Sequence, residues 1–297
     1  MFKIPDKLRK DFFPVGAGGV FHGDALEVLR RLPDRIVQCC ITSPPYWSMK
    51  DYGVPGQIGL EKSPEEYIEK LAYVLHEVRR VMKDDGTLWL NLGDTYCRGG
   101  KSCGLRPKEL VGIPWRVAFA LHKGGWYLRS DIIWHKPDAM PEGVNDRPTR
   151  AHEYIFLLTK SRNYYYNPDE IREPHKLVSL KRMTYKYQGY RKAKSLSSLP
   201  HYRNPDRMCH PLGRNKRSVW TIPKRGFRGN HSATFPHQIP ETCIKAGSKT
   251  GDIVLDPFAG SGTTLETAAR LDRVPLGIEL NERYIKELIM PSVPETA

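Results

Sequence analysis

Residues 252–264 constrain the fold of this chain more than any other feature of the sequence. An apolar run ends in Asp256, a glycine-rich turn with Gly260 and Gly262 follows, and residues typical of a helix begin at Thr263. Glycine lets a ligand approach the backbone closely, and the free N–H groups of a helix N-terminus can donate to that ligand. This strand–turn–helix pattern predicts an α/β sheet with a nucleoside cofactor at the turn.

A second acidic residue supports the cofactor interpretation. Glu279 closes the next apolar run, 23 residues after Asp256, which is the approximate spacing at which an acid meets a ribose hydroxyl in a βαβ unit. A lone glycine-rich loop is as often a structural turn as a nucleotide loop. Here the strand, the helix and the second acid favour the cofactor, and a phosphate loop is a poor alternative because no Gly-Lys-Ser/Thr follows the glycines.

Outside residues 161–230, amphipathic helices alternate with apolar strands. Helices are expected over residues 24–33, 63–86, 114–123, 237–246, 262–271 and 281–290. Strands are expected over residues 19–22, 35–42, 87–92, 126–134, 153–159, 253–255 and 274–278. Such alternation predicts an α/β fold with a mostly parallel, doubly wound sheet.

Positive charge is concentrated in one segment of the chain. Residues 160–228 contain 18 Lys and Arg against 4 Asp and Glu, so this segment carries the whole net charge of +14. A short basic run is as often a solvated face, but aromatic residues are interleaved here with the basic ones. Together they offer phosphate contacts and stacking surfaces, which favours a polyanionic partner.

Other classes of protein fit the sequence poorly. No apolar run approaches the roughly 18 residues that a membrane span needs, and the amino-terminal residues lack the features of a secretory signal. A cytoplasmic protein is therefore expected. The six cysteines form no CxxC pairs and no His cluster accompanies them, so we expect free thiols and no metal site.

A second polar cluster follows the expected strand at residues 35–42. It consists of Ser43, Pro44, Pro45 and Tyr46. Because proline fixes φ and lacks an N–H, the local carbonyls can stay directed outward as acceptors. An amino group on a planar base could donate to Ser43 and to the Pro44 carbonyl while Tyr46 stacks on the ring. The alternative is a rigid turn with aromatic packing.

The Ser-Pro-Pro-Tyr loop, the cofactor turn and the later Gly277-Ile278-Glu279 together resemble the amino-methyltransferase family of bacterial and archaeal DNA modification enzymes. The catalytic motif comes first and the cofactor motif last, which is similar to the permuted beta group of that family. The resemblance covers nearly everything outside residues 161–230. It implies a Rossmann-like methyltransferase fold, S-adenosyl-L-methionine as cofactor, and double-stranded DNA with a flipped target base as substrate.

The resemblance divides the chain into three parts. Residues 1–160 and 231–297 would be the catalytic and cofactor-binding parts of one methyltransferase domain, and residues 161–230 an inserted target-recognition region. The expected catalytic residues are Ser43, Pro44, Pro45 and Tyr46. The expected cofactor residues are Asp256, Phe258, Gly260, Gly262, Thr263, Glu279, Asp24 and Phe235. The expected DNA contacts are Arg214, Lys216, Arg217, Lys224 and Arg225. For Asp24, a helix cap is an equally good explanation.

Ser43 decides the expected base. Adenine-specific relatives usually carry Asp at this position, whereas Ser-Pro-Pro-Tyr followed by an aromatic residue looks like the cytosine-N4 subgroup. Methylation of adenine N6 is the alternative, and a non-catalytic DNA-binding protein or an RNA or protein amine methyltransferase are further ones. Cytosine C5 is disfavoured because that chemistry uses a Cys nucleophile after Pro, and no Pro-Cys occurs here.

The sequence leaves four points undecided. The resemblance suggests a homodimer and a cognate restriction endonuclease as expectations only. Proton loss from the amine through Ser43 or through water is undecided. The whole interpretation also requires that the turns after Thr42 and after Leu255 open into one shared cavity.

Overall fold

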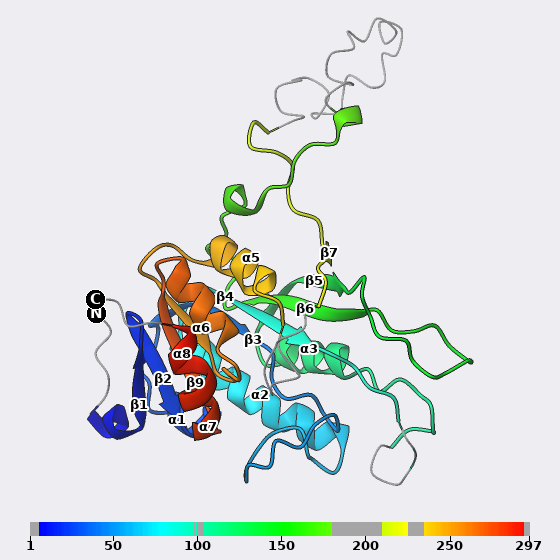
Figure 1. The fold of residues 1–297 in the computed structure, drawn as a ribbon, viewed down its shortest axis with the longest axis horizontal. Helices are drawn as coiled ribbons and strands as arrows, with labels where there is room; N and C mark the ends of the chain where they lie inside the picture. The colour runs from blue at the N-terminus through cyan, green and yellow to red at the C-terminus, as the bar shows by residue number, and fades with distance from the viewer. Residues whose placement is uncertain (1–5, 98, 100–103, 180–209, 225–234, 294–297) are drawn as a thin grey trace, which may run out of the picture. The chain divides into compact units, whose positions relative to one another are not determined.

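The computed structural model describes residues 6–97, 99, 104–179, 210–224 and 235–293 (Figure 1). The chain forms two compact units. The first comprises Met1–Tyr166 together with Ser218–Ala297, and the second comprises Asn167–Arg217. The first unit contains the sheet.

Nine strands form one mixed sheet, in the order β1-β2-β9-β8-β3-β4-β6-β5-β7. Their bounds are β1 Phe12–Val15, β2 Gly18–His22, β3 Val37–Thr42, β4 Met82–Leu92, β5 Tyr127–His135, β6 His152–Thr159, β7 Val219–Thr221, β8 Ile253–Asp256 and β9 Val274–Glu279. The pairs β2–β9, β9–β8, β8–β3, β3–β4 and β5–β7 are parallel. The other three pairs are antiparallel. The expected α/β fold with a mostly parallel sheet is confirmed.

The helices cover both faces of this sheet (Figure 1). Their bounds are α1 Ala25–Leu29, α2 Pro64–Val81, α3 Ile113–Lys123, α5 Gln238–Gly247, α6 Thr263–Arg270, α7 Glu282–Tyr284 and α8 Met290–Ser292, with a π-helical turn at Ile285–Ile289 between the last two and a 3₁₀ helix at Asp6–Asp11. Helices α1, α2 and α3 pack side by side, as do α5 and α6. The sheet is doubly wound, as expected.

The alternation of side chains along β4 accounts for these two faces. Leu88, Leu90 and Leu92 belong to the same buried core as the apolar side of α2, since side chains along a strand alternate between its faces. Trp89 lies on the opposite face, where Gly247 of α5 approaches it closely. Both faces of this part of β4 are therefore buried.

Most helices and strands lie where short-range sequence patterns predict them. Asp24 caps α1 by accepting from the Glu27 amide at 3.1 Å, and Ser63 caps α2 in the same way at 3.2 Å. The expected end of this helix near Gly86 is wrong. The helix ends at Val81, and the next five residues already belong to β4.

Two edge strands were not expected from the sequence. β1 contains Pro14. Because proline lacks an N–H and is tolerated only at sheet edges, its presence in the sequence argues against a strand. β7 is three residues long and lies within residues 161–230, the predicted insertion. Its pairing with β5 is supported by Trp134, whose Nε1 donates to the Ile222 carbonyl at 2.8 Å.

The second unit spans fewer residues than the predicted insertion at 161–230, and it is shorter at both ends. Tyr166, the residue before the unit, stacks on Trp89 of the sheet, with ring centroids 6.5 Å apart. Within the unit, Asp169–Ile171 form a 3₁₀ helix, and Glu173 and Arg214 form an isolated antiparallel bridge. Residues 218–224, which lie within the predicted insertion, belong to the first unit.

Three further features concern the described residues alone. Cys39, Cys40 and Cys97 are buried free thiols, and Cys243 is buried as well. Among the residues that the structure describes, no three His, Cys, Asp or Glu side chains gather closely enough to hold a metal ion. None of the described helices is both long and apolar enough to span a membrane.

Close packing at Gly247 gives the first prediction. A Cβ at this position would lie 2.5 Å from Thr87 Oγ1 and 2.9 Å from Cys39 Sγ, so Gly247→Ala should overpack the α5 face and lower the free energy of unfolding by about 1–3 kcal/mol. Gly143→Ala, where a Cβ meets nothing within 4 Å, should change it by less than about 1 kcal/mol. Urea unfolding of both variants checks this. Equal stability of the two would contradict the packing described here.

Candidate active site

The site is built where β3 and β8 end side by side. The chain leaves β3 toward α2 and β4 on one side and leaves β8 toward α6 and β9 on the other, so the order of the strands reverses between them. In open α/β sheets, ligands bind at the carboxyl ends of the strands at such a switch point. Thr42 Oγ1 donates to Asp256 Oδ1 at 2.7 Å. The two turns that carry the sequence motifs therefore lie together, as the sequence interpretation required.

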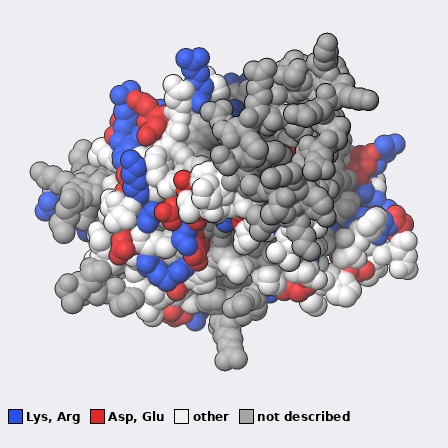
Figure 2. Space-filling model, turned by 90° about the horizontal axis from the view of Figure 1, so that it is seen from above, with Lys and Arg blue, Asp and Glu red and all other residues white. Residues whose placement is uncertain are grey.

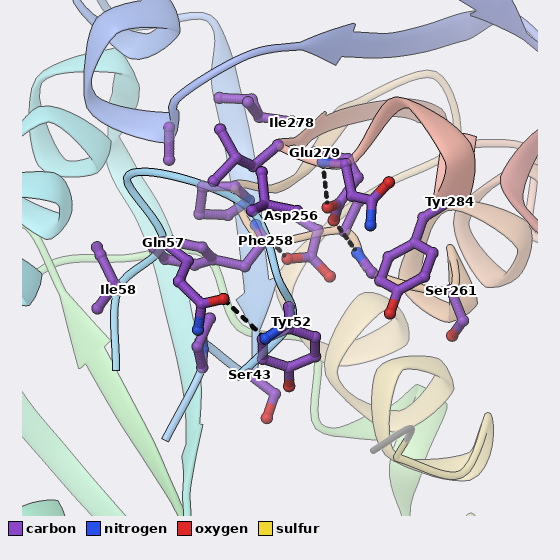
Figure 3. A pocket seen from close by; sticks show the side chains of 18 of the residues that line it. Ser43, Tyr52, Gln57, Ile58, Asp256, Phe258, Ser261, Ile278, Glu279 and Tyr284 are labelled. Atoms are coloured by element: carbon purple, nitrogen blue, oxygen red, sulfur yellow. Dashed lines mark hydrogen bonds between the residues drawn. The ribbon is translucent and has the colours of Figure 1, made fainter. Parts of the chain in front are cut away.

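A first pocket opens between these turns (Figure 3). Its wall includes most of the residues expected to hold the cofactor or to form the catalytic loop, namely Asp24, Ser43, Pro45, Phe235, Asp256, Phe258, Gly260, Thr263 and Glu279. Tyr52 and Tyr284 also line it. Gly262 does not, although its φ of 83° favours glycine and a Cβ there would lie 3.1 Å from Ile289. Its place is in the turn into α6.

Asp256 is held by three donors. Thr42 Oγ1 and Thr264 Oγ1 each donate to its carboxylate at 2.7 Å, and the Phe258 amide donates at 3.1 Å. Burial raises the pKa of Asp256 to about 6, while these hydrogen bonds act in the opposite direction. A buried carboxyl with fixed donors has one orientation, so the wall of the pocket is set before a ligand enters.

Glu279 is fixed by the backbone. Its Oε2 accepts from the Gly260 amide at 2.7 Å and its Oε1 from the Asn281 amide at 2.8 Å (Figure 3). Burial raises the pKa of Glu279 to about 7, the two amides lower it, and the charge of Asp256 raises it further. The glycine-rich turn and the second acid are thus joined directly. Asp24, by contrast, both caps α1 and lines the pocket.

A second pocket adjoins the first, because Ser43, Tyr52 and Phe235 line both. Its remaining wall comes from the catalytic loop and the residues just after it, from the ends of β4, β5 and β6, and from the segment after β7. These residues are Pro44, Tyr46, Met49, Lys50, Asn91, Trp134, Lys136, Glu153 and Lys224. Three members of the expected catalytic loop therefore face this pocket. Pro45, the fourth, lines the first pocket, and its carbonyl accepts from Tyr67 Oη at 2.9 Å.

The second pocket contains a connected polar network. Ser43 Oγ donates to Tyr46 Oη at 3.1 Å, and Tyr46 Oη donates to Glu153 Oε2 at 2.8 Å. The Lys136 ammonium forms an ion pair with the other Glu153 oxygen. Asn91 Nδ2 donates to Tyr46 Oη at 2.8 Å and to Glu153 Oε2 at 2.9 Å. Burial, and then the charge of Glu153, raise the pKa of Tyr46 well above its usual range.

Gly93 makes room for the Tyr46 ring. A Cβ at Gly93 would lie 2.6 Å from Tyr46 Cε2, so a larger residue there would displace the ring. Nearby, Asp94 has a structural part: its Oδ1 accepts from the Gly112 and Ile113 amides, both at 3.0 Å, at the start of α3. The end of β4 thus supports the catalytic loop by packing as well as by hydrogen bonds.

The residues expected to contact DNA fall in different places. Lys224 lines the second pocket of the first unit. Arg214, Lys216 and Arg217 belong to the second unit, where Glu173 pairs with Arg214 at 3.1 Å and with Lys216 at 4.0 Å. Arg225 lies outside the described residues.

No sequence motif predicts a role for Lys136 or Glu153. Each stands at the end or start of an apolar run, and such positions often reach a site at the edge of a sheet. That signal was present, but nothing in the sequence says that β6 runs antiparallel to β4 and brings Glu153 to the same edge as Asn91.

The raised pKa of Asp256 predicts how stability depends on pH. Because its folded pKa of about 6 lies above the ordinary value of 3.8, the folded state binds more protons than the unfolded state between these values. Its contribution to stability is therefore lost as pH rises through that window. As pH rises from 4 to 7, the free energy of unfolding of Asp256→Asn should increase relative to that of the wild type by on the order of 2 kcal/mol. Urea unfolding of the cofactor-free proteins measures the difference, and a pH-independent difference would refute it.

Comparisons with known proteins agree with this arrangement. A DNA methylase family model of the N6/N4 type matches residues 37–290. The Type II methyltransferase M.Cfr9I of Citrobacter freundii is 42% identical over 297 aligned residues, covering 93% of this chain and 88% of the relative. The Type II methyltransferase M.SmaI of Serratia marcescens is 44% identical over 285 aligned residues, covering 89% of this chain and 87% of the relative.

Solved structures confirm the expected Rossmann-like methyltransferase fold. The cytosine-N4-specific PvuII DNA methyltransferase is similar with a TM-score of 0.65 and 21% identity, covering 92% of this chain and 87% of that one. A DNA modification methylase of Thermus thermophilus, solved in complex with S-adenosyl-L-methionine, is similar with a TM-score of 0.59 and 28% identity. The match covers 93% of this chain and 94% of that one. Because the family model matches most of this chain, the chain belongs to the N6/N4 family of DNA methylases.

Proposed function

We propose that this chain transfers the methyl group of S-adenosyl-L-methionine to the exocyclic N4 of a flipped cytosine in double-stranded DNA. Membership of the DNA methylase family supports the methylation of a base amine in DNA. The observation that carries the proposal is the 2.7 Å hydrogen bond between Thr42 and Asp256. It joins the strand that ends in the amine-accepting loop to the strand that ends in the cofactor turn.

The first pocket fits the cofactor. Glu279 lies at the end of β9, and each of its carboxylate oxygens keeps lone-pair capacity beyond the one amide that it accepts. Those lone pairs suit the two hydroxyls of a ribose. Phe258, Tyr52 and Tyr284 add aromatic surface for an adenine ring, and Gly260 lets the ligand approach the backbone. When bound, the cofactor supplies an electrophilic methyl group on a sulfonium.

The second pocket fits the flipped base. An aniline-like amine is a weak nucleophile because its lone pair is delocalised into the ring. Acceptors on both of its hydrogens favour a pyramidal nitrogen and stabilise the positive charge that develops on it. The Ser43 hydroxyl and the Pro44 carbonyl would supply these acceptors, and Tyr46 would stack on the ring. Stacking offsets part of the few kcal/mol that it costs to flip a base.

Ser43 supports cytosine as the target. A carboxylate at this position, as in adenine-specific relatives, is replaced here by a neutral hydroxyl. Methylation of adenine N6 is the second candidate, since Ser43 and Pro44 would accept from that amine as well. The expected homodimer, cytoplasmic location and cognate restriction endonuclease stay predictions.

The second unit and the adjoining basic residues would provide target recognition. On the face in Figure 2, described Lys and Arg side chains are mixed with Asp and Glu. The excess of positive charge lies in residues 160–228 of the sequence. Phosphate contacts would come from Arg214, Lys216, Arg217 and Lys224 of the described residues, and from Arg225.

The reaction product tests the proposed function. Methyl-labelled cofactor and duplex DNA should yield N4-methylcytosine after digestion to nucleosides and mass analysis. Ser43→Ala should retain cofactor affinity and lose about 100-fold in turnover, since it removes an acceptor that acts as charge develops. Asp256→Ala should weaken cofactor binding. N6-methyladenine in the digest would replace cytosine by adenine as the target, and wild-type behaviour of both variants would discredit the site.

A salt series tests the recognition region. Lys216→Gln and Arg217→Gln should each weaken DNA binding and reduce the slope of log K against log salt by about 1, because each phosphate contact releases a counterion. Lys286→Gln, which removes a lysine paired with Glu282 at 2.7 Å on the last helices, is the matched control and should leave the slope unchanged. If all three variants share the wild-type slope, the second unit does not contact phosphate.

A further inference from the structure

The polar network of the second pocket has a direction. Ser43 Oγ donates to Tyr46 Oη, and Tyr46 Oη donates to Glu153 Oε2. The chain of donors thus starts at the hydroxyl that borders both pockets and ends on a carboxylate 107 residues away from Tyr46 in sequence. Stacking of Tyr46 on a base would not require this chain, and neither would cofactor binding.

We propose that Ser43, Tyr46 and Glu153 form a proton relay in which Glu153 is the final acceptor of the proton that leaves the target amine. The proposal rests on the proposed function, because it needs a base amine beside Ser43. As the nitrogen–methyl bond forms, the bonding electrons of the broken sulfur–methyl bond stay on sulfur. The amine proton passes to Ser43 Oγ, the Ser43 proton to Tyr46 Oη, and the Tyr46 proton to Glu153 Oε2.

The relay answers a chemical need of the reaction. A newly methylated amine carries a positive charge and must lose a proton, and a serine hydroxyl is a poor base by itself. When its own proton is already donated onward, the oxygen keeps its lone pairs free and becomes a better acceptor, since hydrogen bonds in a chain polarise one another. The raised pKa of Tyr46 keeps its hydroxyl proton in place for donation at neutral pH.

The neighbours of Glu153 fix its role as the end of the relay. Lys136 pairs with Oε1, which leaves Oε2 to accept from Tyr46. The two hydrogens of Asn91 Nδ2 are shared among Tyr46 Oη, Glu153 Oε2 and, at the longer distance of 3.3 Å, Ser43 Oγ. Asn91 therefore holds these groups together without taking the Tyr46 proton. The Glu153 and Lys136 side chains are 15% and 17% exposed. Water can therefore reach the carboxyl and remove the proton.

Single-turnover methyl transfer tests the relay with three variants. Tyr46→Phe keeps the aromatic ring and removes the hydroxyl. Glu153→Gln keeps an oxygen that accepts from Tyr46 and removes the charge. At saturating cofactor and DNA, each should slow methyl transfer by about 100-fold, the scale of general acid–base catalysis, while both dissociation constants stay unchanged. The double variant should be no slower than the slower single one, because residues of one network are not additive.

Glu241→Gln is the matched control. It also removes a carboxylate from a Lys–Glu ion pair, with Lys245 at 2.7 Å on α5, but it touches neither pocket, and it should transfer methyl groups at the wild-type rate. A rate loss that appears in this control too would overturn the relay, since loss of an ion pair would then suffice.

Two further outcomes would overturn the relay: a wild-type rate in either single variant, or losses that multiply in the double variant. If Glu153→Gln also loses cofactor affinity because Lys136 is left unpaired, Tyr46→Phe decides alone, since it leaves that ion pair intact. The wild-type product separates the two proposals. N6-methyladenine would end the cytosine assignment while the same rates still test the relay, and N4-methylcytosine with unimpaired variants would end the relay alone.

Discussion

The hydrogen bond from Thr42 to Asp256 is the contact on which the site depends. It links the last residues of two neighbouring parallel strands, at a place where the chain departs from the sheet in opposite directions. Every parallel strand delivers its carboxyl end to the same edge, but only at a switch point do the two following turns separate and leave space between them. Ser43 follows one of these strands, the glycine-rich turn follows the other, and their separation makes the first pocket.

Buried acids at this edge are costly to the folded protein. Burial raises the pKa of Asp256 to about 6 and that of Glu279 to about 7, so both carboxylates are less stable in the folded chain than in water at neutral pH. Each is retained with fixed donors, two threonine hydroxyls and an amide for Asp256 and two amides for Glu279. Perturbed acids in a pocket are common at functional sites. The site is thus preorganised at the expense of stability.

Sequence patterns predicted what is local and missed what depends on pairing. The caps at Asp24 and Ser63, the alternation of elements and the two motif turns follow from residues close together in the chain. The end of α2 was misplaced because Met82 continues the helical spacing of apolar residues, yet it starts β4. β7 is held by its pairing with β5 and by the contact between Trp134 and Ile222, 88 residues apart. The approach of Glu153 to Tyr46 likewise depends on strand order, which no local signal encodes.

The antiparallel part of the sheet explains how the second pocket receives its polar groups. A parallel strand presents its last residues at the site edge, as β4 presents Asn91. An antiparallel neighbour presents its first residues there instead, and β6, paired with Leu92 of β4 through Tyr154, brings Glu153 to that edge. β5 runs opposite to β6, so its end brings Lys136, the partner that a carboxylate with little exposure needs. The reversed strand β6 therefore supplies an acid, and its neighbour β5 supplies the counter-charge. Both groups lie opposite the loop that holds Ser43.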